Sequence, residues 1–267
     1  MASRLTLCII HVLSAALFMV PLSSISFAND LETSLHIAVA SNFKQVQQAL
    51  TNEFLASNAT KSLNIVNSSG SSGTLFAQIK HGAPYDLFLS ADQERPETLI
   101  NLGVALKKSR IVYAQGQIVL WQPLAPEPFN LDIFKTYTDK YVLANPKLAP
   151  YGAASHAIMK RSGIWKPKDN SRIVAQNIAT TFQYVASGSI KMGWVAYSQL
   201  KKWQQKSPIS PNSYWLPPVN HYPAIYQVAV QLKRASKKTV ANEYLAFLST
   251  PKAQSLIRSF GYLIPSL

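Results

Sequence analysis

The sequence predicts an α/β protein built of two lobes. Short, mostly apolar runs of the kind that form buried parallel strands recur along the chain, and most are followed by apolar residues at helical spacing. Strands that alternate with helices indicate parallel sheets covered by helices. A long run of strand-forming residues, Ile111 to Trp121, separates two such sets, and 267 residues are enough for two lobes.

The first set begins with a strand from Leu35 to Ala40, and Ser41 is expected to open the helix that follows. The apolar face of that helix consists of Phe43, Val46, Leu50 and Phe54. The further elements expected in this set are a strand over 63–66, a Ser/Gly loop over 67–73, a helix over 74–80, a strand over 85–90, and a helix containing Leu99, Ile100 and Leu102.

The second set is expected to lie between two crossings of the chain, one near Tyr113 and one near Tyr222. It contains strands over 141–144 and 192–196, helices over 153–162, 177–187 and 198–203, and a loop with an edge strand over 207–223. A strand over 224–232 and helices over 239–249 and 251–259 then return to the first lobe, with Thr250 as the cap and Pro251 in the first turn of the last helix. We therefore expect lobe I over 29–113 plus 223–267, lobe II over 114–222, and a ligand cleft between them.

Residues 1–28 have the layout of a secretory signal peptide. Arg4 is followed by an apolar run over 5–20, and the small residues Ser26 and Ala28 precede a break before Asn29. Removal of this segment and a periplasmic location are therefore expected.

The composition of the chain excludes some classes of function. The one cysteine lies inside the signal segment, which excludes a disulfide, a cysteine nucleophile and a thiolate metal site in the exported protein. The full sequence has 26 Lys and Arg against 12 Asp and Glu, and this excess of basic residues suits nucleic acid, an anionic membrane face or a small anion. Export counts strongly against nucleic acid as a partner.

A catalytic or metal site is not indicated. The sequence lacks the Gly-x-Ser-x-Gly elbow and the phosphate-loop motif, and its histidines have no partner at metal-ligand spacing. Asp86 and Asp92 are interpreted as turn and helix-cap residues rather than as an acid/base pair. We expect no catalytic residues and no free metal ion.

Neutral hydrogen-bond donors gather where strands end and helices begin. Ser41 and Asn42 follow the first strand, and the run 68–73 (SSGSSG) precedes a helix in the same way. A helix start offers unpaired N–H groups and a partial positive charge, so two such starts facing one cleft would suit a small anion. The alternative is that these residues only cap helices and form turns.

The second lobe repeats the pattern. Residues 145–154 (NPKLAPYGAA) form a strand end, a Pro-bounded loop and a helix start, with Tyr151 placed to offer its hydroxyl. Ile178 follows Gln176 and Asn177 at another helix start and can offer its backbone N–H. The alternative for Tyr151 is an aromatic loop residue that packs on Pro150.

Five segments of the chain, taken in order, match the motifs of one known family. They are 38–43 (AVASNF), 70–75 (GSSGTL) with 78–79 (QI), 82–92 (GAPYDLFLSAD), the loop 145–154, and 193–199 (GWVAYSQ). On these segments the chain resembles the periplasmic molybdate-binding proteins of ABC transporters. The resemblance covers nearly all of residues 29–267, and the second and third segments together are its specific part.

The resemblance implies a periplasmic-binding-protein fold with two interlobe crossovers, whose lobes close over one tetrahedral oxyanion, molybdate or tungstate. The implied donors are the Ser41 hydroxyl with Asn42, Ser72 with its neighbouring N–H groups, the Tyr151 hydroxyl and the backbone N–H of Ile178. Asn42 can contribute either its side chain or its backbone. The family usually has Val where Ile178 stands, which leaves the backbone donor unchanged.

The resemblance also implies a monomer without a cofactor that delivers its oxyanion to an inner-membrane ABC permease with a cytoplasmic ATPase. One branch of the family has a ligand-contacting tyrosine after the Gly-x-Val strand. Ala196 stands at that place here, so Tyr151 is expected to supply the phenol from elsewhere in lobe II.

Other functions stay open at the level of sequence. A ring of donors suits any fully deprotonated oxyanion, so sulfate fits as well as molybdate and tungstate, whereas phosphate carries a proton that needs an acceptor. An exported α/β hydrolase or transferase would use the same cleft but lacks a recognisable nucleophile and base. A polyanion-binding module is suggested by the basic pairs at 201–202, 233–234 and 237–238 and by Lys206.

Overall fold

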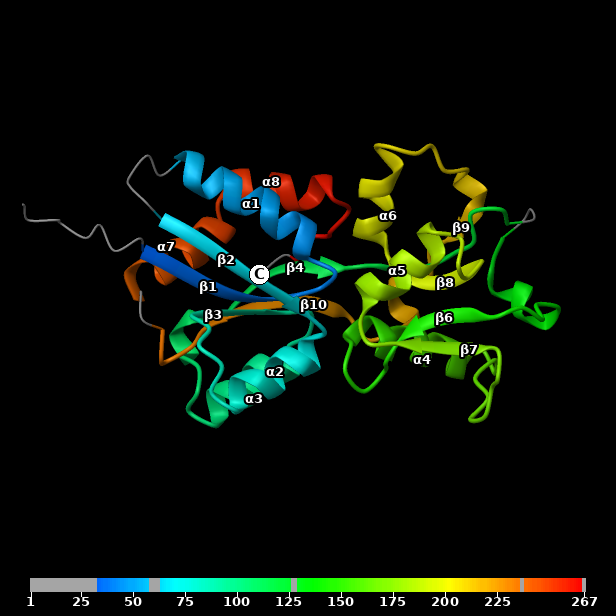
Figure 1. Cartoon of the computed structure of the whole chain (residues 1–267), viewed down its shortest axis with the longest axis horizontal. Coiled ribbons are helices and arrows are strands. Elements are labelled where there is room, and N and C mark those ends of the chain that lie inside the picture. Colours follow the sequence, from blue (N-terminus) through cyan, green and yellow to red (C-terminus); the bar gives the residue numbers. More distant parts are fainter. Residues whose placement is uncertain (1–32, 58–62, 126–128, 236–237, 266–267) are drawn as a thin grey trace, which may run out of the picture. The chain divides into compact units, whose positions relative to one another are not determined.

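Two five-stranded sheets with helices on their faces carry the fold (Figure 1). This computed structural model describes residues 33–57, 63–125, 129–235 and 238–265. The predicted signal peptide, 1–28, lies outside the described residues. Within those ranges, no helix is both long and apolar enough to span a bilayer.

The first sheet consists of β1 (Thr33–Ala40), β2 (Leu63–Gly70), β3 (Leu87–Ser90), β4 (Ile111–Gly116) and β10 (Ile225–Gln231). Its strand order is β2-β1-β3-β10-β4. β1 pairs in parallel with β2 and β3, as the alternation of strands and helices predicts, but β10 runs antiparallel to both β3 and β4. The sheet is therefore mixed rather than wholly parallel, because β10 arrives from the second sheet and not through a helical crossover.

Helices cover both faces of this sheet. Alternate residues of β1 supply two cores, as the period of a strand requires: Leu35, Ile37 and Val39 pack with α1 (Lys44–Ser57), α7 (Lys238–Leu248) and α8 (Pro251–Ser259), and Ala38 packs with α2 (Ser72–Lys80) and α3 (Glu94–Asn101). In Figure 1, α1 and α8 lie on one side of the sheet and α2 and α3 on the other.

The second sheet has the order β7-β6-β8-β5-β9. Its strands are β5 (Ile118–Trp121), β6 (Tyr141–Ala144), β7 (Arg172–Ala175), β8 (Met192–Ala196) and β9 (Tyr214–Trp215). One face packs on α4 (Pro150–Arg161), and the other packs on α5 (Ile178–Ala186) and α6 (Tyr197–Gln204). β7 is missing from the sequence prediction because it is a four-residue edge strand with only three apolar residues.

Four short 3-10 helices complete the described elements. They are η1 (Lys107–Ser109), η2 (Leu131–Lys135), η3 (Pro211–Ser213) and η4 (Val219–His221).

The chain crosses between the sheets twice. β4 belongs to the first sheet and β5 to the second, so the first crossing occurs at Gln117, and the second lies between β9 and β10. The predicted lobe boundary between residues 113 and 114 would divide β4. We therefore propose that, among the described residues, lobe I lies within 33–116 and 223–265 and lobe II lies within 117–222.

Four predicted boundaries next to the cleft are wrong by a few residues, and one of them is the start of α2, which lies at Ser72 instead of Thr74. Residues 67–70 extend β2 instead of forming a loop, because they pair in register with residues 37–40 and the strand hydrogen bonds outweigh their turn preference. Residues 41–43 form a turn, and α1 begins at Lys44. α4 begins at Pro150, three residues earlier than predicted, with proline in the first turn that suits it.

Candidate functional site

The five residues singled out in the sequence come together around one small cavity. Ser41, Asn42, Ser72, Tyr151 and Ile178 all line it. The cavity has room for little more than one water-sized sphere, about 10 Å³. The other residues in its wall are Ala40, Gly70, Ser71, Ala149 and Pro150.

The turn after β1 supplies donors from the first lobe. The Ser41 N–H is held by Gly70 O at 2.9 Å, which fixes this turn beside the end of β2. Among the described residues, neither the Ser41 hydroxyl nor the Asn42 backbone N–H makes a hydrogen bond. Both residues are buried and line the cavity. Their unpaired groups are therefore available to a ligand that enters it.

The two serines at the start of α2 have different functions. Ser71 is the helix cap: its Oγ accepts from the Thr74 N–H at 3.2 Å and lies 2.7 Å from Thr74 Oγ1. Ser72 Oγ accepts from the Ala91 N–H at 3.0 Å, after β3. Because that bond occupies a lone pair and not the proton, the Ser72 hydroxyl can still donate into the cavity.

Tyr151 reaches the cavity from the first turn of α4. Its side chain is buried, and its hydroxyl makes no hydrogen bond among the described residues. Burial, and next to it the Tyr262 phenol, raise the pKa of Tyr151 well above the usual value, so the hydroxyl stays protonated at neutral pH. A buried phenol without a partner is costly, and a bound anion would satisfy it.

Two glycines allow Tyr151 to occupy this position. A Cβ on Gly116, at the end of β4, would overlap the Tyr151 hydroxyl and lie 2.9 Å from its Cζ. A Cβ on Gly152 would overlap the carbonyl oxygen of Ala144, where β6 ends. The first turn of α4 therefore packs directly against the end of β6 in the second sheet, while the Tyr151 side chain extends to the end of β4 in the first sheet. A side chain at either Gly152 or Gly116 would clash.

Ile178 opens α5 and contributes through its backbone. The side chain of Asn177 caps the helix, because its Oδ1 accepts from the N–H groups of Ala179 at 2.9 Å and Thr180 at 3.1 Å. The Ile178 N–H has no hydrogen bond among the described residues. The Asn177 side chain thus satisfies the N–H groups of Ala179 and Thr180 and leaves the Ile178 N–H free to bind a ligand.

A buried network behind the cavity holds Asn42 in place. The Asn42 side-chain amide donates to Gln227 Oε1 at 2.8 Å and to Tyr262 Oη at 2.9 Å, and Tyr262 Oη donates to Asn42 O at 3.0 Å. Ser198, on α6 of the second lobe, donates to Tyr262 Oη at 3.1 Å. Both amide protons of Asn42 are therefore used, which leaves its backbone N–H as the donor for a ligand.

Two backbone carbonyls tie the lobes together at the start of α2 and α3. The Gly73 N–H donates to Leu148 O at 2.8 Å. Arg95, held by Asp92 at 2.6 Å, donates to Lys147 O at 3.0 Å. The loop before α4 is thus bonded to the first lobe.

The electrostatics of the cavity come from neutral groups. Within the described ranges, no acidic, basic or histidine side chain lines it. Hydroxyls and N–H groups at helix starts carry the positive ends of dipoles, so the site favours an anion that needs donors only. Within the described part of the chain, no cluster of three His, Cys, Asp or Glu could hold a metal ion.

The network predicts a measurable effect at high pH. Burial raises the pKa of Tyr262 from 10.0 to about 12, against smaller opposing effects of Ser198 and Asn42. A raised folded-state pKa gives stability that is complete below pH 10 and is lost as the pH rises towards 12. The two-unit shift corresponds to roughly 3 kcal/mol. We expect urea unfolding to show a steeper loss of stability above pH 10 in the wild type than in Tyr262→Phe; equal slopes would contradict this.

Comparison with known proteins identifies the class of protein to which this chain belongs. Residues 35–263 match the family described as bacterial extracellular solute-binding protein. The structure superimposes on the Azotobacter vinelandii periplasmic molybdate-binding protein with a TM-score of 0.80 and 33% identity, over 87% of this chain and 100% of that one. The chain belongs to the bacterial extracellular solute-binding family.

Two curated relatives with 32–35% sequence identity are both molybdate-binding proteins. The molybdate-binding protein ModA of Rhodobacter capsulatus is 35% identical over 198 residues, which cover 73% of this chain and 75% of the relative. The ModA of Azotobacter vinelandii is 32% identical over 233 residues, which cover 85% and 89%. The predicted two-lobed fold and the resemblance to molybdate-binding proteins are confirmed.

Some residues of the site could not be recognised in the sequence. Gly116, Ser198 and Tyr262 are far from the donors along the chain and become neighbours only through the fold. Gln227 had a local signal, because it is a polar residue inside an otherwise apolar strand. Its side chain is fully buried, and such a position usually indicates a hydrogen-bonded partner.

Proposed function

We propose that this chain binds molybdate, and also tungstate, in the cavity between its lobes. The observation that carries the proposal is the donor set. Three hydroxyls and two backbone N–H groups from four separate chain segments surround the cavity, and no carboxylate or other ionised side chain lines it. The names of the relatives at 32–35% identity support the same ligand.

The donor set favours an oxyanion without a proton. Such an anion accepts hydrogen bonds at every oxygen, and each donor around the cavity has a hydrogen to give. A protonated phosphate would present its own O–H to a wall that has no side-chain carboxylate to accept it. The burial of a dianion without a counter-charge is costly, so several short hydrogen bonds must act together.

The proposed physiological function is import. The chain would collect the oxyanion in the periplasm as a monomer and deliver it to an inner-membrane ABC permease with its cytoplasmic ATPase. The membership in an extracellular solute-binding family supports this. We propose no enzymatic activity and no cofactor, because the described residues that line the cavity include no histidine, aspartate or glutamate that could act as a base.

A thermal-shift panel tests the ligand. A ligand that binds only the folded chain at a hundred times its Kd stabilises it by about 2.7 kcal/mol, which for a protein of this size raises Tm by roughly 5 to 10 °C. We expect this rise with molybdate and with tungstate and a smaller one with sulfate. No rise with millimolar molybdate or tungstate would reject the proposal. A larger rise with sulfate or phosphate that is lost in Ser72→Ala would reassign the ligand.

A further inference from the structure

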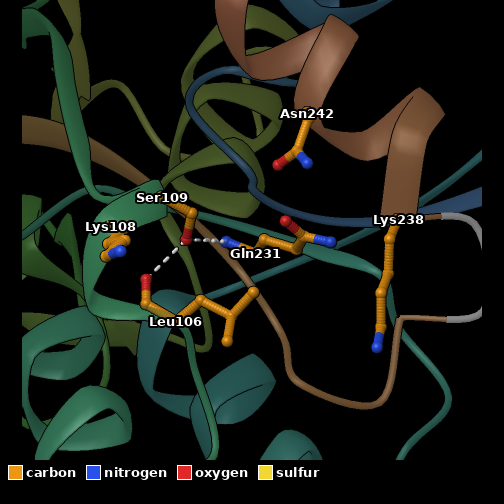
Figure 2. A pocket seen from close by; sticks show the side chains of 6 residues that line it. All are labelled: Leu106, Lys108, Ser109, Gln231, Lys238 and Asn242. Carbon is orange, nitrogen blue, oxygen red and sulfur yellow. Dashed lines mark hydrogen bonds between the residues drawn. The ribbon is translucent and has the colours of Figure 1, made fainter.

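A second cavity lies at the opposite end of the first sheet from the oxyanion site. Its volume is about 220 Å³, and Figure 2 shows its lining side chains. Gln231, the last residue of β10, pairs with Leu87 at the beginning of β3, whereas β3 ends at Ser90 beside the oxyanion site. The lining residues are Leu106, Lys108, Ser109, Gln231, Lys238 and Asn242.

The side chain of Gln231 has no protein partner although it is buried. It is only 1% exposed, and among the described residues neither its Oε1 nor its Nε2 makes a hydrogen bond. An unsatisfied buried polar group of this kind destabilises the folded state. Its backbone, in contrast, is fixed: the Gln231 N–H donates to Ser109 Oγ at 2.8 Å, and Gln231 O accepts from the Leu106 N–H at 2.9 Å.

The surroundings of this amide are cationic. Lys108 and Lys238 both line the cavity, and Figure 2 shows them on opposite sides of Gln231, with the Lys238 ammonium extending away from the amide and the amide of Asn242 pointing towards it from α7. Neither lysine forms an ion pair with a described residue. Among the residues that the structure describes, no acidic side chain lines the cavity. The Ser109 hydroxyl already donates to Leu106 O at 2.6 Å, so the free groups are two ammonium donors and two carboxamides.

We propose that this second cavity binds a protonated phosphate group, free or as a small phosphomonoester. A carboxamide offers one donor and one acceptor side by side. A hydrogen phosphate matches it, because a phosphate oxygen accepts from Gln231 Nε2 while the P–O–H donates to Gln231 Oε1. The lysines supply the counter-charge. This is the opposite of the donor-only oxyanion site, which has no place for the proton.

The proposal is independent of the ligand of the first site and is tested with that site occupied. The chain is saturated with molybdate, and inorganic phosphate is added at pH 6.5 with the ionic strength held constant by sodium chloride. We expect Tm to rise with the logarithm of the phosphate concentration and to rise less with equal sulfate, which lacks the proton. Glycerol phosphate, run in parallel, shows whether a monoester is also accepted.

Matched variants locate the effect. Gln231→Leu, and separately Lys108→Ala with Lys238→Ala, are expected to weaken phosphate binding at least tenfold and to leave the molybdate shift unchanged. Lys107→Ala, an exposed neighbour that does not line the cavity, is the control and should bind phosphate as the wild type does. The lysine pair is exposed, so its replacement tests the site even where Gln231→Leu does not fold.

Two results would overturn the proposal. One is the absence of any rise in Tm with both phosphate and glycerol phosphate, which would assign the cavity to ordered water. The other is a phosphate effect of equal size in the wild type, in Gln231→Leu and in the lysine double variant, which would place the anion elsewhere on the basic surface.

Discussion

Replacement of Gly116 by alanine is expected to lower the affinity for molybdate about 10- to 150-fold. The added Cβ would overlap the Tyr151 hydroxyl and lie 2.9 Å from its Cζ, so the ring must move out of the cavity. The Tyr151 hydroxyl then no longer reaches the ligand, and the loss of a hydrogen bond to a charged ligand costs about 1.5 to 3 kcal/mol. Isothermal titration calorimetry of wild type and Gly116→Ala with molybdate measures the effect.

Tyr151→Phe is the matched control for this prediction. It removes the hydroxyl that the new methyl group would strike, and the remaining ring carbon requires only a small shift. Gly116→Ala should therefore cost much less affinity in the Tyr151→Phe background than in the wild type, with a coupling energy above about 1 kcal/mol. Additive effects of the two substitutions would show that Gly116 does not act through Tyr151.

The second large effect is expected from Ser72→Ala, with Ser71→Ala as its neighbour for comparison. Ser72 offers its proton to the cavity, whereas both hydrogen bonds of the Ser71 hydroxyl lie within the helix cap. Ser72→Ala should weaken molybdate binding about 10- to 150-fold, the equivalent of one hydrogen bond to a charged group. Ser71→Ala should lower the free energy of unfolding by about 0.5 to 2 kcal/mol and keep nearly full affinity.

The comparison separates a ligand contact from a structural one. Ser72→Ala also removes the acceptor of the Ala91 N–H, so some loss of stability is expected and does not count against the prediction. Calorimetric affinity and urea unfolding are measured for both variants. An unchanged affinity in Ser72→Ala, or an equal loss of affinity in Ser71→Ala, would remove Ser72 from the site.

Local patterns were sufficient to predict most of the fold. The strands over 141–144 and 192–196 occur with the predicted bounds, as does the last helix, where the Thr250 hydroxyl accepts from the Ala253 N–H. These elements combine strong periodicity with clear ends. The antiparallel pairing of β10 and the short edge strand β7 were not predicted, because both depend on tertiary pairing rather than on local preference.

The part of the site that lies at the ends of strands and the starts of helices could be predicted from the sequence. Ser41, Ser72 and Ile178 lie directly at strand ends and helix starts, where backbone donors are free. Which serine caps and which faces the cavity depends on contacts such as Ala91 to Ser72, which join distant parts of the chain. Gly116 is similar, because its importance lies in the tyrosine that approaches it from the other lobe.

A crystal structure grown with molybdate and phased at the molybdenum absorption edge would locate the bound oxyanion directly. One strong anomalous peak is expected in the cavity between the lobes. Its oxygens should lie about 2.6 to 3.2 Å from the hydroxyls of Ser41, Ser72 and Tyr151 and from the backbone nitrogens of Asn42 and Ile178. An empty cavity in crystals that contain molybdate, or a molybdenum peak held by other residues, would contradict the proposed oxyanion site.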